Sequence, residues 1–185
     1  MATVEIIKPA IITLEFRQEK DDPDYGSCMW ARFFIDTENY DLQIMSDCGN
    51  YAYGWYPTPN AESFMKLLSR INDSYLLDKL SSRTVINEEA TFEELKKFYF
   101  DETIGRSEED RNIFLDNLKE ACFIEADVEL WSAVEQCLSS WDIDYDSYDV
   151  LMCVNKDYPA NAQKIVEVFM NYIQPKIKEL LKGVE

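Results

Sequence analysis

The chain contains no histidine, which removes the commonest general base and metal ligand at neutral pH. Catalytic groups that pair histidine with serine or cysteine are therefore excluded. The sequence has only five glycines and no glycine-rich nucleotide-binding pattern, so a loop that cradles phosphate groups is not expected. The composition favours a binding protein over an enzyme and predicts neither a cofactor nor a bound metal.

Basic residues are also scarce. Lys and Arg number 18 against 36 Asp and Glu, which gives a formal net charge of -18. The arginines are scattered without a basic stripe, so direct binding to nucleic acid is not expected. A small domain needs a net charge of magnitude only about 2–8 to stay soluble. The surplus of carboxylates therefore indicates a partner with a basic surface.

No apolar run approaches the ~18 residues that span a bilayer, and the N-terminus has no signal-peptide pattern. We therefore expect no membrane partner and a cytoplasmic location. The five cysteines are odd in number and never form a Cys-x-x-Cys pair, so no zinc knuckle or disulfide framework is predicted. Cys48 lies in a turn where no cation nearby in sequence would stabilise a thiolate, and we expect it to be buried under a sheet.

Length and a hydrophobic content of 46% predict one domain over residues 1–185. The apolar pattern has a period near two in residues 1–57, which are predicted to be mainly β-sheet, and near 3.6 in residues 58–185, which are predicted to be mainly helical. The expected fold is α+β, with an N-terminal antiparallel sheet of three to five strands packed against a C-terminal half of five or six helices.

Local signals predict where the helices begin. Pro59 suits a first helical position, and Thr91 and Ser107 each begin a capping-box pattern. Pro159 is expected to start the last helix. Pro175 lies inside that helix and lacks the N–H that would bond four residues back, so we expect a kink there. The same helix is apolar enough to pack within the chain or to form the seam of a homodimer.

A run of 36 residues, 120–155, contains nine carboxylates and no Lys or Arg. Aspartates are interleaved with aromatic residues within residues 141–149. In an extended chain, Asp142, Asp144 and Asp146 would project to one face at intervals of about 6.6 Å and could imitate a nucleic-acid backbone. The alternative is a solvated acidic loop whose aromatics are held in the core. The candidate partner-binding residues are Glu125, Asp127, Glu129, Trp141, Asp142, Asp144, Tyr145, Asp146, Tyr148 and Asp149.

Carboxylates can also hold metal ions. Residues 142–146 match the first three ligands of an EF-hand loop, but Ser147 replaces its glycine and Cys153 its bidentate glutamate, so a calcium loop is not predicted. A metal-dependent nuclease could use residues 125–129 or the aspartates at 142–149. The absence of Lys and Arg around them disfavours this alternative, because phosphates would meet only negative charge.

Several short segments in the first half of the chain carry a resemblance to known proteins. They are Ser46-Asp47-Cys48-Gly49-Asn50-Tyr51, Tyr53, Gly54-Trp55, Pro57-Thr58-Pro59, Glu62-Ser63-Phe64 and Tyr75-Leu76-Leu77. They resemble small proteins carried by phages and mobile elements of Firmicutes, whose acidic members include type II-A anti-CRISPR proteins, the inhibitors of Cas9. The resemblance covers roughly residues 4–80 and includes no catalytic motif.

This resemblance implies that the partner is Cas9 or the Cas9–guide RNA complex in a bacterial host cell. Cas9 holds nucleic acid in a positively charged channel, so an acidic face could block DNA binding or cleavage. A metal-dependent nuclease acting on guide RNA, and an acidic phage protein that binds another host factor, remain alternatives. The mimicry hypothesis requires that the carboxylates be concentrated on one surface and not be neutralised by the chain's own basic side chains.

Overall fold

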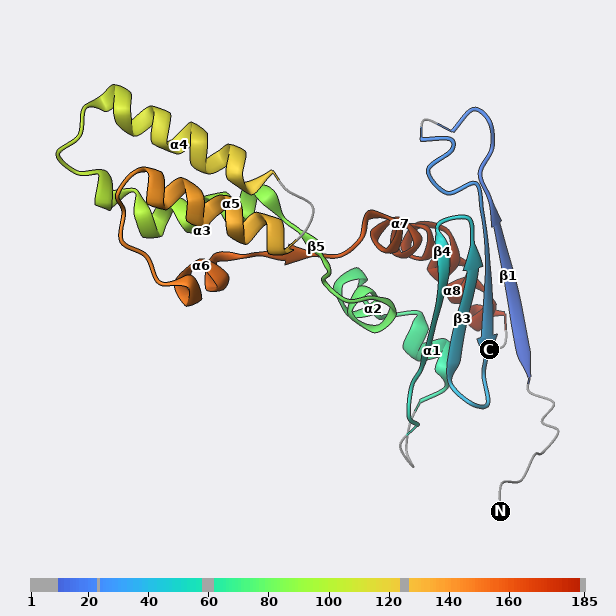
Figure 1. Cartoon of the computed structure of the whole chain (residues 1–185). Helices are drawn as coiled ribbons and strands as arrows, with labels where there is room; N and C mark the ends of the chain where they lie inside the picture. The colour runs from blue at the N-terminus through green and yellow to red at the C-terminus, as the bar shows by residue number, and fades with distance from the viewer. Residues whose placement is uncertain (1–9, 23, 58–61, 124–126, 184–185) are drawn as a thin grey trace, which may run out of the picture. The chain divides into compact units, whose positions relative to one another are not determined.

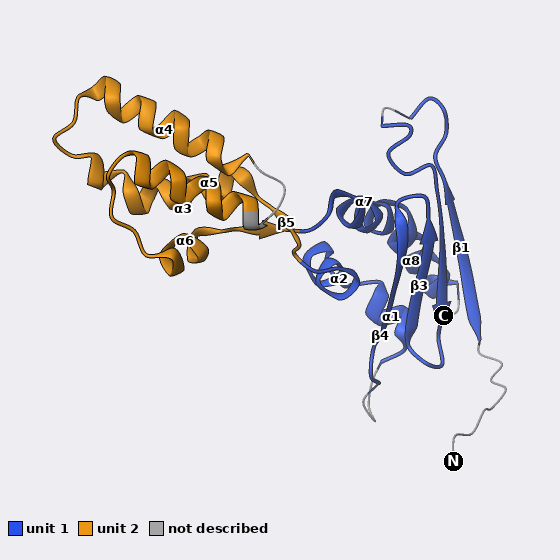
Figure 2. Ribbon diagram, viewed as in Figure 1, with its two compact units in different colours: residues 1–82, 158–185 blue, residues 83–157 orange. Residues whose placement is uncertain are grey.

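The computed structural model describes residues 10–22, 24–57, 62–123 and 127–183. The chain divides into two compact units (Figure 2). Unit 1 contains residues 1–82 and 158–185, and unit 2 contains residues 83–157. The change of period at residue 57 therefore falls inside unit 1, to which the last helix returns. The single domain over residues 1–185 stays a prediction.

Unit 1 is built on a four-stranded antiparallel sheet in which each strand pairs with the next along the chain (Figure 1). Its strands are β1 (Ile11–Arg17), β2 (Trp30–Asp36), β3 (Asp41–Ser46) and β4 (Gly49–Gly54). In β2, Ala31, Phe33 and Ile35 are fully buried while Arg32 between them is exposed. One face of the sheet therefore contributes to the core, as the period of two predicts.

Helices of unit 1 cover one face of this sheet (Figure 1). They are α1 (Phe64–Leu68), α2 (Asp73–Leu80) and a C-terminal run of α7 (Ala160–Val168), the π-helical η2 (Phe169–Ile173) and α8 (Gln174–Lys182). The fully buried Phe169 of η2 places its ring 6.0 Å from that of Phe33 in β2. The predicted α+β fold is confirmed.

A kink is predicted at Pro175, and the helical run contains a π-helical turn just before this proline. Gln174 donates its backbone N–H to the carbonyl of Phe169, five residues back. Pro175 then stands at the beginning of α8, where a missing N–H is tolerated. The wider turn therefore accommodates the proline within one continuous helical run. Pro159 caps the start of that run, in agreement with the prediction.

Gln174 is buried and ties α8 to α1. Its side-chain Nε2 donates to the carbonyls of Leu68, at 3.1 Å, and Ile71, at 2.8 Å. We expect Gln174→Ala to lower the free energy of unfolding of unit 1 by about 1–3 kcal/mol, because two carbonyls lose their partner away from water. Urea denaturation measures the change. Lys178→Ala removes only an exposed donor to Gln174 and should change stability by less than ~0.5 kcal/mol. Equal losses in the two variants would contradict the prediction.

Unit 2 is a small helical unit with its own core (Figure 2). It contains β5 (Val85–Ile86), α3 (Glu88–Tyr99), η1 (Asp101–Thr103), α4 (Glu108–Cys122), α5 (Asp127–Ser140), α6 (Ser147–Cys153) and β6 (Lys156–Asp157). The fully buried Leu95, Phe114, Leu118 and Leu130 lie in this core. β5 and β6 pair antiparallel, so the chain enters and leaves the unit at one place.

The first residues of the observed helices show which of the predicted capping residues are correct. Ser107 caps α4, since its Oγ accepts the backbone N–H of Asp110 at 3.1 Å. The cap at Thr91 is wrong: α3 begins at Glu88, and the Asn87 side chain accepts the N–H of Ala90. Thr91 is instead buried within the helix. Its hydroxyl accepts the N–H of the sequence-distant Asn155, at 3.0 Å. Pro59 lies outside the described residues.

The described residues contain about seven helices when the run from α7 to α8 counts as one, against five or six predicted. The additional helix is α6, which begins within the acidic run of residues 141–149. It begins there because Asp146 accepts the backbone N–H of Tyr148 at 2.7 Å. None of the helices in the described part of the chain has the length and apolar character of a membrane span.

Candidate functional site

Most of the surplus negative charge belongs to unit 2. Residues 83–157 contain 20 Asp and Glu against 7 Lys and Arg, a formal net charge of -13, which leaves -5 for unit 1. Because like charges in a small unit reinforce one another, the potential at its surface is strongly negative. A binding site for a basic partner is therefore expected in this unit.

An open hollow of about 700 Å³ lies between the end of α3 and the segment that leads into α6. We call it the acidic hollow. It is lined by Phe98, Tyr99, Glu102, Asp144, Tyr145, Asp146, Ser147 and Asp149. Four of these eight residues carry a carboxylate, and none is basic. Three of the four carboxylates, those of residues 144, 146 and 149, belong to the site predicted from the sequence.

In the segment between α5 and α6, exposed aspartates alternate with residues that are buried or half-buried. Ile143 is buried and anchors the segment to the core, while Asp142, Asp144 and Asp146 on either side are exposed. Asp142 has a φ of 53° in the turn that ends α5 and does not line the acidic hollow. Asp149 follows in the first turn of α6, where the helix dipole favours a negative charge.

The carboxylates of the acidic hollow are not neutralised by the chain itself. No ion pair joins them to a lysine or arginine among the residues that the structure describes. Nearby basic groups have other contacts: Arg106 donates to the carbonyl of Trp141, and the guanidinium of Arg111 lies 4.1 Å from the ring centre of Phe100. The hollow therefore carries negative charge that no ion pair among the described residues compensates.

Tyr99 adds a buried polar group to the lining. Its side chain is 5% exposed, and its hydroxyl has no hydrogen-bond partner among the described residues. Burial raises the pKa of Tyr99 to about 12, with further contributions from Cys153, Asp149 and Asp146. The hydroxyl is therefore neutral at physiological pH. A buried hydroxyl without a partner costs stability, and such costs concentrate at functional sites.

We expect Tyr99→Phe to raise the free energy of unfolding of unit 2 by about 1 kcal/mol, because it removes a buried polar group that lacks a partner. Thermal unfolding of the full chain measures the change. Tyr148→Phe is the matched control: Tyr148 is 64% exposed, so its hydroxyl meets water and the variant should unfold within ~0.5 kcal/mol of the wild type. Destabilisation by Tyr99→Phe would show instead that the hydroxyl has a partner such as an ordered water.

The three predicted aromatic anchors lie in different surroundings. The Trp141 ring packs 5.7 Å from that of Phe114, against the core of unit 2. Tyr145 is half-buried against the same core, and its hydroxyl lies 3.4 Å from Ser139 Oγ. Tyr148 alone of the three is exposed. The alternative in which the aromatics are held in the core therefore describes Trp141 and Tyr145.

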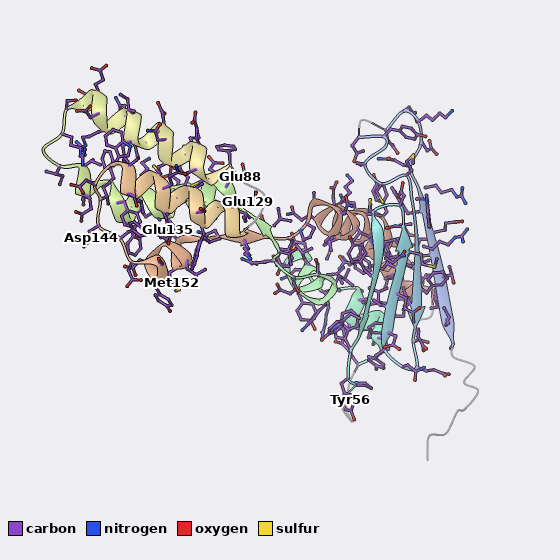
Figure 3. All side chains as sticks on the ribbon, viewed as in Figure 1. Tyr56, Glu88, Glu129, Glu135, Asp144 and Met152 are labelled. Atoms are coloured by element: carbon purple, nitrogen blue, oxygen red, sulfur yellow. The ribbon has the colours of Figure 1, made fainter. Side chains whose placement is uncertain are left out.

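Two exposed apolar residues of α6, Leu151 and Met152, were not predicted from the sequence. Leu151 is 46% and Met152 64% exposed, and both share a helix face with Tyr148 because they follow it by three and four residues. Phe98, which lines the acidic hollow, is also exposed. Figure 3 shows Met152 on α6 and Asp144 on the segment before it. The hollow is thus accompanied by apolar surface on its own elements.

Other predicted site residues lie elsewhere. Glu129 is exposed on α5 and does not line the acidic hollow (Figure 3). Glu125 and the side chain of Asp127 lie outside the described residues. Glu102 and Tyr99 were missed by the sequence analysis, because nothing in their neighbourhood signals contact with a segment more than 40 residues away. Only the fold brings them together.

A comparison with protein families gives one match. The model of a phage family, Phage_phiTE_072, matches residues 5–179. The chain belongs to this phage family. The predicted phage origin of the protein is confirmed at this level, and the match extends over both units of the phage protein. No curated protein and no solved structure matches it.

The geometry also bears on the nuclease alternative. Within the described part of the phage protein, only Cys28, Asp47 and Cys48 form a group of three or more potential metal ligands close enough to share an ion. The aspartates at 142–149 do not form such a group, because they alternate along an exposed segment and the start of α6. Their arrangement suits a row of contacts better than a single cation.

Proposed function

We propose that this phage protein binds a basic, nucleic-acid-binding surface of a host protein through the acidic hollow of unit 2. The observation that carries the proposal is the gathering of four uncompensated carboxylates beside exposed apolar residues. The partner that we propose is Cas9, alone or with guide RNA, in the cytoplasm of the bacterial host. Occupation of its basic channel would block DNA binding or cleavage.

The acidic hollow suits arginine and lysine side chains of such a partner. Carboxylates accept the paired N–H groups of a guanidinium in a bidentate geometry, and these charge-assisted hydrogen bonds are among the strongest in proteins. A volume of about 700 Å³ can admit several side-chain ends at once. Because the hollow is open and its carboxylates are exposed, salt should weaken the ion pairs that they form with a partner.

The apolar residues of α6 supply the second part of a binding surface. Tyr148 and Met152 are the most exposed members of the face described above. Aromatic and methionine side chains are enriched at protein interfaces, whereas acidic residues alone are depleted there. When such apolar groups pack against a partner they exclude water around neighbouring polar contacts. This combination favours a protein partner over a small cation.

The choice of Cas9 among basic host proteins rests on the resemblance of residues 4–80 to phage-borne anti-CRISPR proteins. Membership of a phage family supports a role against the host, and the charge of unit 2 is opposite to that of a DNA-holding channel. An acidic phage protein with another basic target in the host is the alternative that the experiment must separate.

Gel filtration of the phage protein with Cas9, with and without guide RNA, at two salt concentrations tests this proposal. We expect co-elution at the lower salt, less at the higher salt, and reduced cleavage of target DNA in a parallel assay. Absence of both effects would exclude Cas9. A pull-down from host lysate would then test the wider proposal, which fails if no basic protein depends on the carboxylates of the acidic hollow for its capture.

A further inference from the structure

Three potential metal ligands meet at one end of the sheet in unit 1. Cys28 precedes β2, while Asp47 and Cys48 form the turn between β3 and β4. One ligand atom from each of the three side chains lies within 4.8 Å of the others. The strand register explains the meeting: Ala31 pairs with Ser46, so the residues just beyond this pair continue side by side. The cysteines are 20 positions apart, and no sequence motif marks them.

From this geometry we propose that unit 1 binds a zinc-type divalent cation between the thiolates of Cys28 and Cys48 and the carboxylate of Asp47. The inference is independent of the proposed function, which concerns unit 2. Two sulfur ligands and one oxygen ligand form a donor set that suits zinc, whereas magnesium and calcium prefer oxygen ligands alone.

Backbone contacts hold the carboxylate in place. Asp47 accepts the N–H of Met29 at 2.9 Å through Oδ2 and that of Trp30 at 3.3 Å through Oδ1. Each oxygen still has a lone pair for a metal ion. Hydrogen bonds of this kind orient metal-ligating carboxylates in proteins. Asp47 is therefore fixed toward the two thiols before any ion arrives.

The turn also directs Cys48 inward. Gly49 has a φ of 117°, which glycine adopts without strain, and its carbonyl accepts the hydroxyl of Ser46 at 2.6 Å. The hydroxyl of Tyr51 donates to the carbonyl of Cys48 at 3.0 Å. Cys48 is 4% exposed, and its Sγ lies 3.0 Å from the carbonyl of Ser27. The sulfur is consequently held beneath the turn, beside that of the fully buried Cys28.

The distances allow a tetrahedral site. With bonds of about 2.3 Å to sulfur and about 2.0 Å to oxygen, the ligand atoms of a tetrahedral zinc ion lie roughly 3.3–3.8 Å apart. The three ligand atoms lie within 4.8 Å of one another, so binding requires them to move closer together. Asp47 is exposed, so water can supply the fourth ligand from that side. Binding replaces one proton on each thiol, and both protons leave to solvent.

Titration of the reduced, metal-free full chain with Co²⁺ tests the site, because thiolate–cobalt bonds give a charge-transfer absorption that free Co²⁺ lacks. We expect one equivalent of Co²⁺ to produce this band and Zn²⁺ to abolish it by displacement. Thiol counting before and after titration tests for a Cys28–Cys48 disulfide, whose formation in place of metal binding would overturn the proposal.

Variants assign the ligands. Cys28→Ser and Cys48→Ser should lose the band, and Asp47→Asn should weaken Co²⁺ binding by about 10- to 100-fold. Cys137→Ser is the matched control, because it changes a buried cysteine of unit 2 and should leave the band intact. Circular dichroism verifies that each variant folds. If a serine variant unfolds, Asp47→Asn still tests the site. No band in the wild type, or full binding by all three ligand variants, would overturn the proposal.

Discussion

Neutralising the four carboxylates of the acidic hollow is expected to weaken partner binding about 100-fold at ~0.1 M salt. The variant replaces Glu102 by Gln and Asp144, Asp146 and Asp149 by Asn. An exposed charge pair contributes about 0.7 kcal/mol, so four such pairs contribute about 2.8 kcal/mol, which corresponds to a change of about 100-fold in affinity. Isothermal titration calorimetry with the isolated partner measures the affinity directly.

The variant should fold normally. Asparagine at position 146 can still cap α6 because its side-chain oxygen accepts the N–H of Tyr148 as the carboxylate does. The removal of four like charges from a unit with a net charge of -13 also reduces electrostatic repulsion. A loss of binding in the folded variant would therefore report on the interface and not on the stability of unit 2.

A second variant with the same change in net charge separates the site from the total charge. It replaces four exposed carboxylates of unit 1, Glu19, Asp21, Glu38 and Asp78, by their amides. We expect its affinity to stay within about threefold of the wild type, since distant charges act mainly on the association rate. The dependence of affinity on salt should be shallower only in the variant of the acidic hollow. Equal losses in the two variants would contradict a localised site.

The sheet could be predicted because its signal is local. In β2 the buried Ala31 and Phe33 flank the exposed Arg32, and polar turn residues separate the strands. The period of two in such a segment follows from which face meets the core. The cap at Ser107 could be predicted for the same reason, since its partner Asp110 is three residues away.

Contacts between distant segments could not be predicted in this way. The period of the last helix shows that Phe169 is buried, but not that its ring meets Phe33 in β2. Thr91 matches a capping pattern, and yet its hydroxyl is taken by Asn155, which arrives through the pairing of β5 with β6. A single sequence reveals local conformational preferences, whereas the pairing of distant segments depends on the whole chain.

The residues of the two candidate sites also differ in whether a local sequence signal indicates them. Asp144 and Asp146 attract notice in the sequence because they belong to a dense acidic run. Tyr99, from a different helix, becomes part of the acidic hollow only through the packing of unit 2. Cys28 and Cys48 carry no metal-binding spacing, and their proximity follows from the register of β2 with β3. Absence of a sequence motif is therefore a weak argument against a site assembled by a sheet.

Phe169→Ala is expected to lower the free energy of unfolding of unit 1 by about 3–5 kcal/mol. Phe169 is fully buried, and the ring is replaced by a cavity that the surrounding sheet and helices can fill only in part. Hydrogen exchange followed by mass spectrometry measures the effect in each segment. We expect faster exchange in the strands of unit 1, with the amides of α4 in unit 2 still protected.

Phe114→Ala is the reciprocal variant, because Phe114 is equally buried but belongs to the core of unit 2. The two cores share no buried residue among those that the structure describes. We therefore expect Phe114→Ala to expose the amides of α4 and α5, to leave β2 and β3 protected, and to weaken partner binding, since Phe114 supports Trp141 at the start of the segment that leads into α6. Cobalt binding at the sheet should persist. If each variant instead accelerated exchange equally in both units, the chain would unfold as the single cooperative domain that its length predicts, and the separation of the two cores would have no energetic consequence.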